Sequence, residues 1–212
     1  MKAVKDLLLD FFFPPKCIFC RKLLGKGEKD YCLSCSLDLP ENDGIRVIPG
    51  AQACRAPLRY EGKARDAMIR YKFSGLSCYG PAFARLMVPL ASSSGAELIV
   101  WIPVSFRRRL ERGYDQTELI AKELSVRTGI PAKKVLRKKH TGRQSAAGGP
   151  EARKRNVKGA FSVTDETAVR GRKLLLLDDV CTTGATLSEA VSVLNKAGAG
   201  EIFCEVAMMT QE

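Results

Sequence analysis

The stretch Leu174-Leu-Leu-Leu-Asp-Asp-Val-Cys-Thr-Thr-Gly-Ala-Thr-Leu187 combines a hydrophobic strand, two adjacent carboxylates and a loop of small residues. Four consecutive leucines are typical of a strand buried on both faces, as in parallel sheets covered by helices. Ligand sites in such sheets lie at the carboxyl ends of the strands, which is where Asp178 and Asp179 fall. Buried carboxylates need partners, so vicinal hydroxyls or a hydrated Mg²⁺ are natural ligands for this acidic pair.

The loop that follows the acidic pair has the composition of a phosphate site. Its threonines and Gly184 offer hydroxyls and free backbone N–H groups, and a helix is expected to run on through Leu187 to Ala197. The positive end of that helix would face a bound phosphate. The loop lacks the lysine and the glycine spacing of a Walker P-loop, which argues against an NTPase. The alternative is an ordinary strand-to-helix connection with a threonine cap and a solvated aspartate pair.

The whole stretch resembles the signature motif of type I phosphoribosyltransferases. The resemblance implies that Asp178 and Asp179 contact the ribose hydroxyls of phosphoribosyl pyrophosphate, with Mg²⁺, and that the loop holds the 5′-phosphate. Thr182 stands where purine-salvage members commonly carry an aspartate placed to interact with the base, so a purine-salvage role is weakened. The residues expected to bind phosphoribosyl pyrophosphate are Asp178, Asp179, Cys181, Thr182, Thr183, Gly184, Ala185 and Thr186.

Two cysteine pairs near the amino terminus form a second pattern. Cys17 and Cys20 make the first pair, and Cys32 and Cys35 follow after a spacer of eleven residues. Such pairs can surround one structural Zn²⁺ with four thiolates. A segment of about forty residues has little core of its own, so metal binding would supply much of its folding free energy. Redox-active pairs and structural disulfides are the alternatives, although neither pair opens a helix in a βαβ unit and nothing indicates export.

Segments typical of strands and helices alternate along the rest of the chain. Helices are expected at 63–73, 79–91 and 115–127, and strands at 51–60, 98–104, 133–136, 160–163 and 201–208. In the first helix, Arg65, Arg70 and Lys72 are expected on the outer face. The pattern predicts an α/β fold, with a mainly parallel sheet and flanking helices as in type I phosphoribosyltransferases. We expect a small zinc module with an amino-terminal helix at residues 1–48 and a phosphoribosyltransferase-like domain at residues 49–212.

Composition agrees with a zinc protein of the cytoplasm. The chain has 212 residues, of which 45% are hydrophobic, so it can bury a substantial core. Four further cysteines, Cys54, Cys78, Cys181 and Cys204, are expected to be small buried thiols. The apolar run at residues 7–13 contains a charge and ends in two prolines, so it is expected to be a packed helix rather than a signal peptide. No segment has the roughly twenty apolar residues that a membrane-spanning helix needs.

A basic loop is expected where the strand at 98–104 ends. Ser105, Arg107 and Arg108 could bind a pyrophosphate through backbone N–H groups and guanidinium groups. Type I phosphoribosyltransferases place their pyrophosphate loop after the corresponding strand, so the resemblance favours the same role here. A solvated basic turn is the alternative.

Further motifs resemble the ComF/GntX family of competence-type, phosphoribosyltransferase-like proteins, and the likeness covers nearly the full length. They are the prolines before Cys17, the four cysteines, Ile69-Arg-Tyr-Lys-Phe-Ser-Gly75, Ile102-Pro-Val104, Arg112-Gly-Tyr-Asp-Gln116, Thr141-x-x-Gln144, Arg153, Asn156 and Gly159-Ala-Phe161. A flexible loop over the site is expected to include Arg112, Gln116, Gln144, Arg153 and Asn156. Asp115 stands where the family more often has Asn, and a carboxylate there could alter a hydrogen bond at the pyrophosphate end.

The resemblance implies a role in DNA uptake during natural transformation, with single-stranded DNA and a competence helicase as expected partners. The charge supports nucleic-acid binding, because the net charge is +12 and residues 133–158 hold ten Lys or Arg against the single Glu151. That segment could equally close over pyrophosphate, or be a solvated loop with neither role. Aromatic residues for stacking on DNA are sparse there, and Phe19 and Tyr31 in the zinc module are better candidates.

Two functions of different class therefore remain. In the first, the protein binds phosphoribosyl pyrophosphate or a related nucleotide and handles single-stranded DNA. In the second, it is an active phosphoribosyltransferase of nucleotide metabolism that transfers the phosphoribosyl group to an unidentified acceptor base. Ligand binding is favoured over turnover, because no residue can be assigned to selecting a base.

Overall fold

The computed structural model describes residues 14–138 and 159–211. The expected amino-terminal helix lies outside the described residues, as do Gln144, Arg153, Asn156 and most of the basic segment.

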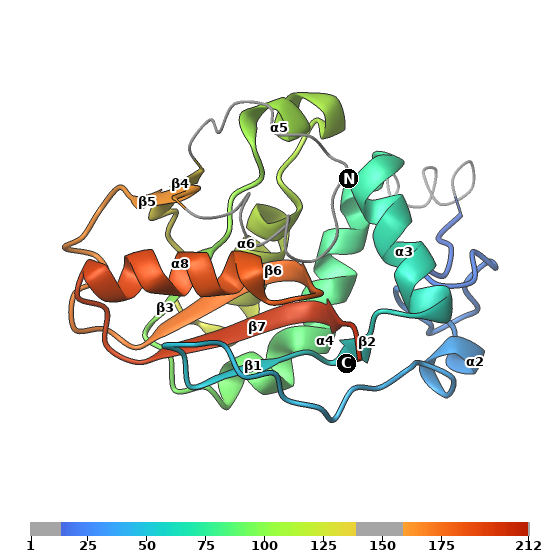
Figure 1. The fold of residues 1–212 in the computed structure, drawn as a ribbon. Helices are drawn as coiled ribbons and strands as arrows, with labels where there is room; N and C mark the ends of the chain where they lie inside the picture. Colours follow the sequence, from blue (N-terminus) through green and yellow to red (C-terminus); the bar gives the residue numbers. More distant parts are fainter. Residues whose placement is uncertain (1–13, 139–158, 212) are drawn as a thin grey trace.

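A parallel sheet forms the centre of the fold (Figure 1). Its strands are β1 (Ala53–Arg55), β2 (Leu58–Arg59), β3 (Leu98–Trp101), β6 (Leu174–Cys181) and β7 (Ile202–Met209). The order is β1-β7-β6-β3, with β2 also paired to β7, and every pairing is parallel. The predicted mainly parallel sheet is therefore confirmed, and its two central strands, β6 and β7, are the longest.

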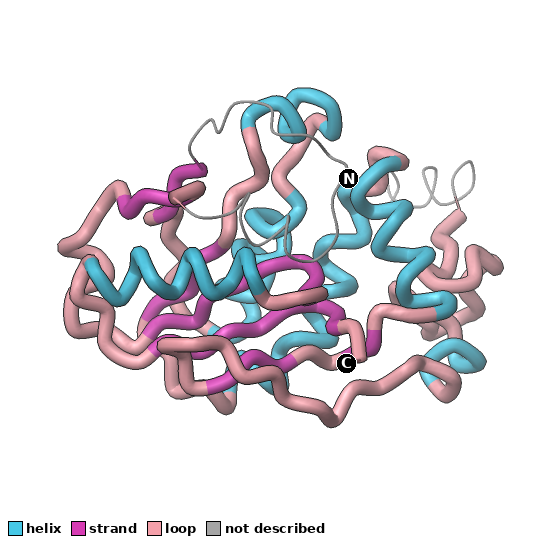
Figure 2. Tube along the Cα trace, in the orientation of Figure 1, coloured by secondary structure: helices cyan, strands magenta, loops and turns pink. Residues whose placement is uncertain are grey.

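Helices cover both faces of this sheet (Figures 1 and 2). Helices α3 (Gly62–Phe73), α4 (Gly80–Ser92) and α6 (Gln116–Thr128) pack on one face, and α8 (Ala185–Lys196) packs on the other. The remaining elements are α2 (Leu33–Ser36), the 3₁₀ turn η1 (Ser77–Tyr79), α5 (Phe106–Arg112), and strands β4 (Leu136–Lys138) and β5 (Phe161–Val163). Strands β4 and β5 pair with each other in antiparallel fashion, outside the main sheet.

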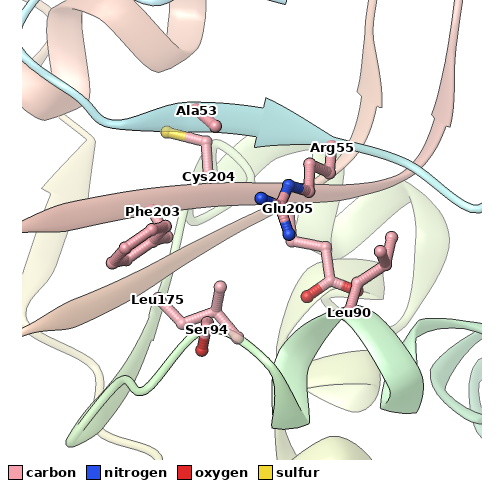
Figure 3. Close-up of a pocket in the computed structure, with 8 residues that line it drawn as sticks. All are labelled: Ala53, Arg55, Leu90, Ser94, Leu175, Phe203, Cys204 and Glu205. Atoms are coloured by element: carbon pink, nitrogen blue, oxygen red, sulfur yellow. The ribbon is translucent and has the colours of Figure 1, made fainter. Parts of the chain in front are cut away.

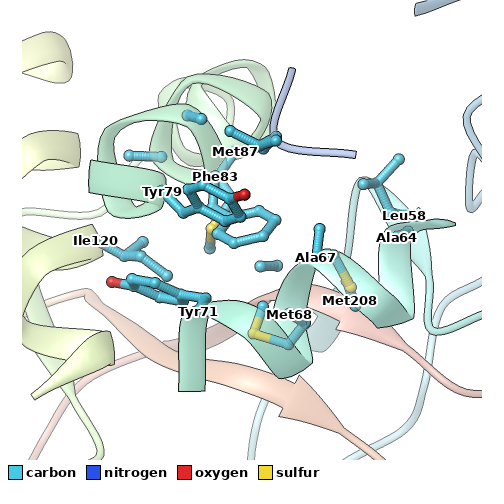
Figure 4. Close-up of a cluster of buried hydrophobic side chains, with 14 of the residues drawn as sticks. Leu58, Ala64, Ala67, Met68, Tyr71, Tyr79, Phe83, Met87, Ile120 and Met208 are labelled. Atoms are coloured by element: carbon cyan, nitrogen blue, oxygen red, sulfur yellow. The ribbon is translucent and has the colours of Figure 1, made fainter. Parts of the chain in front are cut away.

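Aromatic and sulfur-containing side chains form the core under α3, α4 and α6 (Figure 4). Tyr71 of α3 packs on Phe83 of α4 with ring centroids 5.4 Å apart, and both side chains are fully buried. Ile18 and Phe19 of the cysteine module belong to the same buried cluster. The cysteine module therefore packs directly against the helices that support the sheet.

Glu205 is a buried carboxylate in the middle of β7. It is 1% exposed, and neither of its oxygens has a hydrogen-bond partner among the described residues. Burial raises the pKa of Glu205 well above its usual value, while the charge of Arg55 opposes the shift. Its side chain points to the end of α4, beside a cavity of about 10 Å³ near Leu90 and Ser94 (Figure 3). Nothing in the predicted strand at 201–208 indicated that its one interior acid would face inward.

Within the part of the chain that the structure describes, every helix is too short or too polar to cross a membrane.

Candidate functional site

The acidic pair, Asp178 and Asp179, lies in the carboxyl-terminal half of β6, at the carboxyl edge of the sheet. Asp179 Oδ1 lies 2.7 Å from Lys72 Nζ of α3, and both side chains are mostly buried, with 13% and 17% of their surfaces exposed. Asp178 Oδ1 accepts a hydrogen bond of 2.8 Å from the backbone N–H of Asp179. Burial, together with the neighbouring charge of Asp179, raises the pKa of Asp178 to about 8. The two adjacent carboxyl groups therefore differ, because Asp179 is paired with a cation and burial beside Asp179 raises the pKa of Asp178.

A buried arginine, Arg46, supports the loop at residues 182–186 through hydrogen bonds to backbone carbonyl oxygens. Arg46 is 8% exposed, and its guanidinium donates to the carbonyl oxygens of Thr182 and Thr210, the latter at 2.8 Å. The backbone of Arg46 lies beside β1 and pairs with Cys54 in an antiparallel bridge. This side chain thus ties the loop to the end of β7 and to the edge of the sheet.

Gly184 allows the loop to turn into α8 above this support. Its φ is +71°, a conformation that favours glycine, and an added Cβ would lie 2.7 Å from Ile48 Cδ1, so that side chain would have to shift. Helix α8 begins at the next residue, which places its first backbone N–H groups and its positive end at the loop. The structure therefore brings a helix amino terminus next to the acidic pair, as the sequence predicted.

Cys181 lies at the junction between β6 and this loop and is 2% exposed. A hydrogen bond with Cys54 and the nearby Arg46 guanidinium lower the pKa of the Cys181 thiol to about 6, against the effect of burial. Cys204 is buried as well, but Cys78 is exposed. The prediction of four small buried thiols is wrong for Cys78, because the 3₁₀ turn η1 holds this residue at the surface.

Three cations act on the acidic pair electrostatically. Lys72 is the first of them. The other two are Arg112 and Lys138: burial lowers the pKa of each, while the charge of Asp179 raises the pKa of Arg112 and both aspartates raise the pKa of Lys138. Arg108 lies close enough to influence both Arg112 and Lys138. The carboxyl edge of the sheet is therefore an electropositive surface around two carboxylates, which favours a ligand with several negative charges.

The segment expected to be a pyrophosphate loop begins a short helix instead. Ser105 caps α5, and its Oγ accepts from the backbone N–H of Arg108 at 3.4 Å. Arg107 forms an exposed ion pair of 2.6 Å with Glu111 along the same helix. The loop was predicted because of its arginines, but a serine cap followed by seven residues without Gly or Pro favours a helix. The binding role of Ser105, Arg107 and Arg108 stays a prediction.

Arg112 and Gln116 lie at helix ends rather than in a loop. Arg112 ends α5, and its Nη1 donates to Gln116 Oε1 of α6 at 2.9 Å. Asp115, between them, is 4% exposed and caps α6 by accepting from the N–H groups of Glu118 and Val104, both at 3.1 Å. Asp115 thus fastens this turn to the end of β3 and faces inward, and its effect on a contact with pyrophosphate stays a prediction.

The four amino-terminal cysteines come together as the sequence predicted. The sulfur atoms of Cys17, Cys20, Cys32 and Cys35 all lie within 4.8 Å of one another, and those of Cys20 and Cys32 are 3.7 Å apart. Zn–S bonds of about 2.3 Å in a tetrahedron place sulfurs roughly 3.8 Å apart, so the cluster could hold a metal such as zinc. Phe19, expected as a stacking platform for DNA, is only 2% exposed because it packs inward beside Tyr31.

Two residues of this site were not predicted from the sequence. Lys72 was expected on the outer face of its helix, yet it reaches Asp179. Arg46 lies in a turn-rich segment that gave no sign of contact with the loop. The helical spacing of α3 could have placed Lys72 near the edge of the core, but no sequence signal indicated Arg46.

Comparisons with known proteins agree with this geometry. The family model described as the phosphoribosyl transferase domain matches residues 111–210, a range that includes the acidic pair and the loop. Competence protein F of Haemophilus influenzae is 29% identical over 90% of this chain and 95% of its own length. DNA utilization protein YhgH of Escherichia coli K12 is 28% identical over 90% of this chain and 96% of its own. Competence protein ComFC of Streptococcus pneumoniae is 26% identical over 81% of this chain and 71% of its own.

The fold and its acidic edge define a protein of the type I phosphoribosyltransferase fold. Competence and DNA utilization proteins match this chain over most of its length, so within that class the chain is similar to the ComF family.

Proposed function

We propose that this protein binds phosphoribosyl pyrophosphate with Mg²⁺ and takes part in DNA uptake in the cytoplasm, where it handles single-stranded DNA. The observation that carries the ligand proposal is the convergence of the acidic pair and the amino terminus of α8 at one edge of the sheet. Asp178 and Asp179 would receive the ribose hydroxyls, and the loop from Thr182 to Thr186 would receive the 5′-phosphate. Carboxylate oxygens suit Mg²⁺, which would neutralise the pyrophosphate charge when bound.

Calorimetric titration with phosphoribosyl pyrophosphate in the presence of Mg²⁺ tests the ligand proposal. We expect the double substitution Asp178→Asn and Asp179→Asn to abolish binding, because amides are weaker partners for Mg²⁺ and for the hydroxyls. Asp66→Asn, an exposed position on α3, is the matched control and should bind as the wild type does. Equal affinity of the double variant and the wild type would refute this site.

The DNA proposal draws on the names of the relatives and on an exposed surface next to the acidic edge. Phe106 of α5 is 69% exposed and Phe73 of α3 is 70% exposed, and the Arg112 guanidinium lies 4.8 Å from the Phe73 ring centroid. Three consecutive arginines, 107–109, follow Phe106 on the same exposed helix. Aromatic rings beside basic side chains are the groups that bind single strands without regard to sequence. A competence helicase is the protein partner implied by the family.

Salt-titrated binding of a fluorescent oligonucleotide tests this surface. Each phosphate contact contributes about 0.7 to the slope of log affinity against log salt, so replacing all three arginines with Gln should lower that slope by about 2. Neutralising Arg137, Lys138 and Lys139 tests the other basic segment in the same assay. An unchanged slope in both variants would exclude both surfaces as the DNA contact.

Catalytic phosphoribosyl transfer is the second candidate, favoured by the match to the phosphoribosyl transferase domain. Its test is pyrophosphate release from phosphoribosyl pyrophosphate with a panel of nucleobases. Release that depends on a base and disappears in the double aspartate variant would support an enzyme. If no base accelerates the release, ligand binding without catalysis is the remaining function.

A further inference from the structure

Lys72 of α3 forms an ion pair with Asp179 of the acidic pair. Its ammonium is 2.7 Å from Asp179 Oδ1, and 17% of the side chain is exposed. An exposed ion pair contributes little to stability, whereas desolvated charges depend strongly on each other. The ammonium of Lys72 thus contacts the Asp179 oxygen that would otherwise bind a ribose hydroxyl or a hydrated Mg²⁺.

The backbone that carries Lys72 is fixed on both sides of it. The Tyr114 hydroxyl donates to the carbonyl oxygen of Tyr71, and the Tyr71 hydroxyl donates to the carbonyl oxygen of Gln116 at 2.8 Å. On the other side, the Phe73 ring packs under Arg112. These contacts join the end of α3 to the turn between α5 and α6. The ammonium can therefore leave Asp179 by rotation of its own side chain, without movement of the helix.

A divalent cation and the ammonium cannot share Asp179 favourably. Two cations within a few ångströms repel each other strongly in a partly desolvated site. Mg²⁺ that arrives alone must displace Lys72 and leave its charge without a partner, which is costly. Mg²⁺ that arrives with a pyrophosphate group supplies a new anionic partner for the displaced ammonium.

We propose that Lys72 makes the acidic pair selective for a pyrophosphorylated sugar. Its ammonium excludes divalent cations from Asp179 until a bound pyrophosphate group offers the ammonium a new anionic partner. The proposal rests on the proposed function, since it assigns the ligand of that same site. Lys72 is then a specificity-determining residue. It disfavours ribose 5-phosphate, which brings hydroxyls and a 5′-phosphate but no second anion, relative to phosphoribosyl pyrophosphate.

Substitution of Lys72 by Met tests the proposal, and Lys63→Met is the matched control. Lys63 lies on the same helix and pairs with Asp38 at the same distance of 2.7 Å, but that pair is exposed. The first measurement is a titration with Mn²⁺ alone, in which electron paramagnetic resonance reports the bound fraction of the metal. We expect Lys72→Met to bind Mn²⁺ about tenfold more tightly than the wild type, and Lys63→Met to match the wild type. Adding Asp179→Asn to Lys72→Met should remove the gain.

The second measurement is calorimetric titration with the two sugars in the presence of Mg²⁺. The preference of the wild type for phosphoribosyl pyrophosphate over ribose 5-phosphate should fall about tenfold in Lys72→Met. Lys72→Gln serves if the Met variant does not fold, as judged by circular dichroism. Lys72→Arg keeps the charge and should retain the exclusion of Mn²⁺.

The two measurements separate this proposal from the proposed function. If the wild type binds neither sugar, the ligand assignment fails, while the Mn²⁺ titration still reports whether Lys72 guards Asp179. If the wild type binds phosphoribosyl pyrophosphate but Lys72→Met changes neither Mn²⁺ affinity nor sugar preference, the role of Lys72 is overturned.

Discussion

The ends of two neighbouring parallel strands, β6 and β3, are built in opposite ways. After β6, the loop at 182–186 is held from below by the buried Arg46 and is shaped around Gly184. After β3, helix α5 has no buried residue, and its arginines 107–109 lie in solvent. A fixed loop suits a small anion that must be held in one geometry, because preorganised donors lose little entropy on binding. An exposed basic helix suits a long and variable polyanion.

The largest effect is expected when the fixed end is loosened. Arg46→Met removes the guanidinium hydrogen bonds to the partly buried carbonyl oxygens of Thr182 and Thr210, so we expect the free energy of unfolding to fall by about 3 kcal/mol. Urea denaturation measures this change. Arg65→Met, at an exposed site on α3, should leave stability unchanged. A stable Arg46→Met protein that still binds ligand would show that the loop does not depend on this support.

Glu205 tests whether the sheet beneath both strand ends tolerates a buried charge. Its folded-state pKa is raised, so its contribution to stability is complete below the unfolded pKa and is lost as pH rises above that value. We expect Glu205→Gln to match the wild type near about pH 4. At higher pH the variant should be more stable, by about 1.4 kcal/mol for each pH unit up to the folded-state pKa. A difference in unfolding free energy between Glu205→Gln and the wild type that does not change with pH across this range would contradict the prediction.

A smaller effect is expected at the junction that anchors the exposed end. Asp115→Asn retains one capping acceptor, but its amide group would face the N–H of Val104, so one buried donor loses its partner. The free energy of unfolding should fall by about 1–2 kcal/mol. Hydrogen exchange of the Val104 amide should also become faster. Unchanged stability and exchange would show that this turn does not depend on the Asp115 carboxylate.

The same contrast explains what could be predicted from the sequence. The leucine run, the acidic pair and the four cysteines are local patterns, and the structure places each of them as expected. Arg46 and Lys72 reach the site through long-range contacts, across 136 and 107 residues of sequence, which local patterns do not contain. The arginine run after Ser105 is compatible with a basic loop as well as with a helix, and the Ser105 cap is the local signal that favours the helix.

The smallest effect on stability is expected at the exposed end itself. Phe106 is 69% exposed, so Phe106→Ala removes almost no buried surface and should change the free energy of unfolding by less than about 0.5 kcal/mol. If a base stacks on this ring, the same substitution should weaken binding of single-stranded DNA by about 1–3 kcal/mol in a fluorescence titration. Val126→Ala, on the far end of α6 and 82% exposed, is the control for loss of a surface hydrophobic side chain. A large change in DNA affinity with no change in stability would separate recognition from folding at the β3 end. Equal DNA affinity in both variants would instead leave the arginines of α5 to act through charge alone.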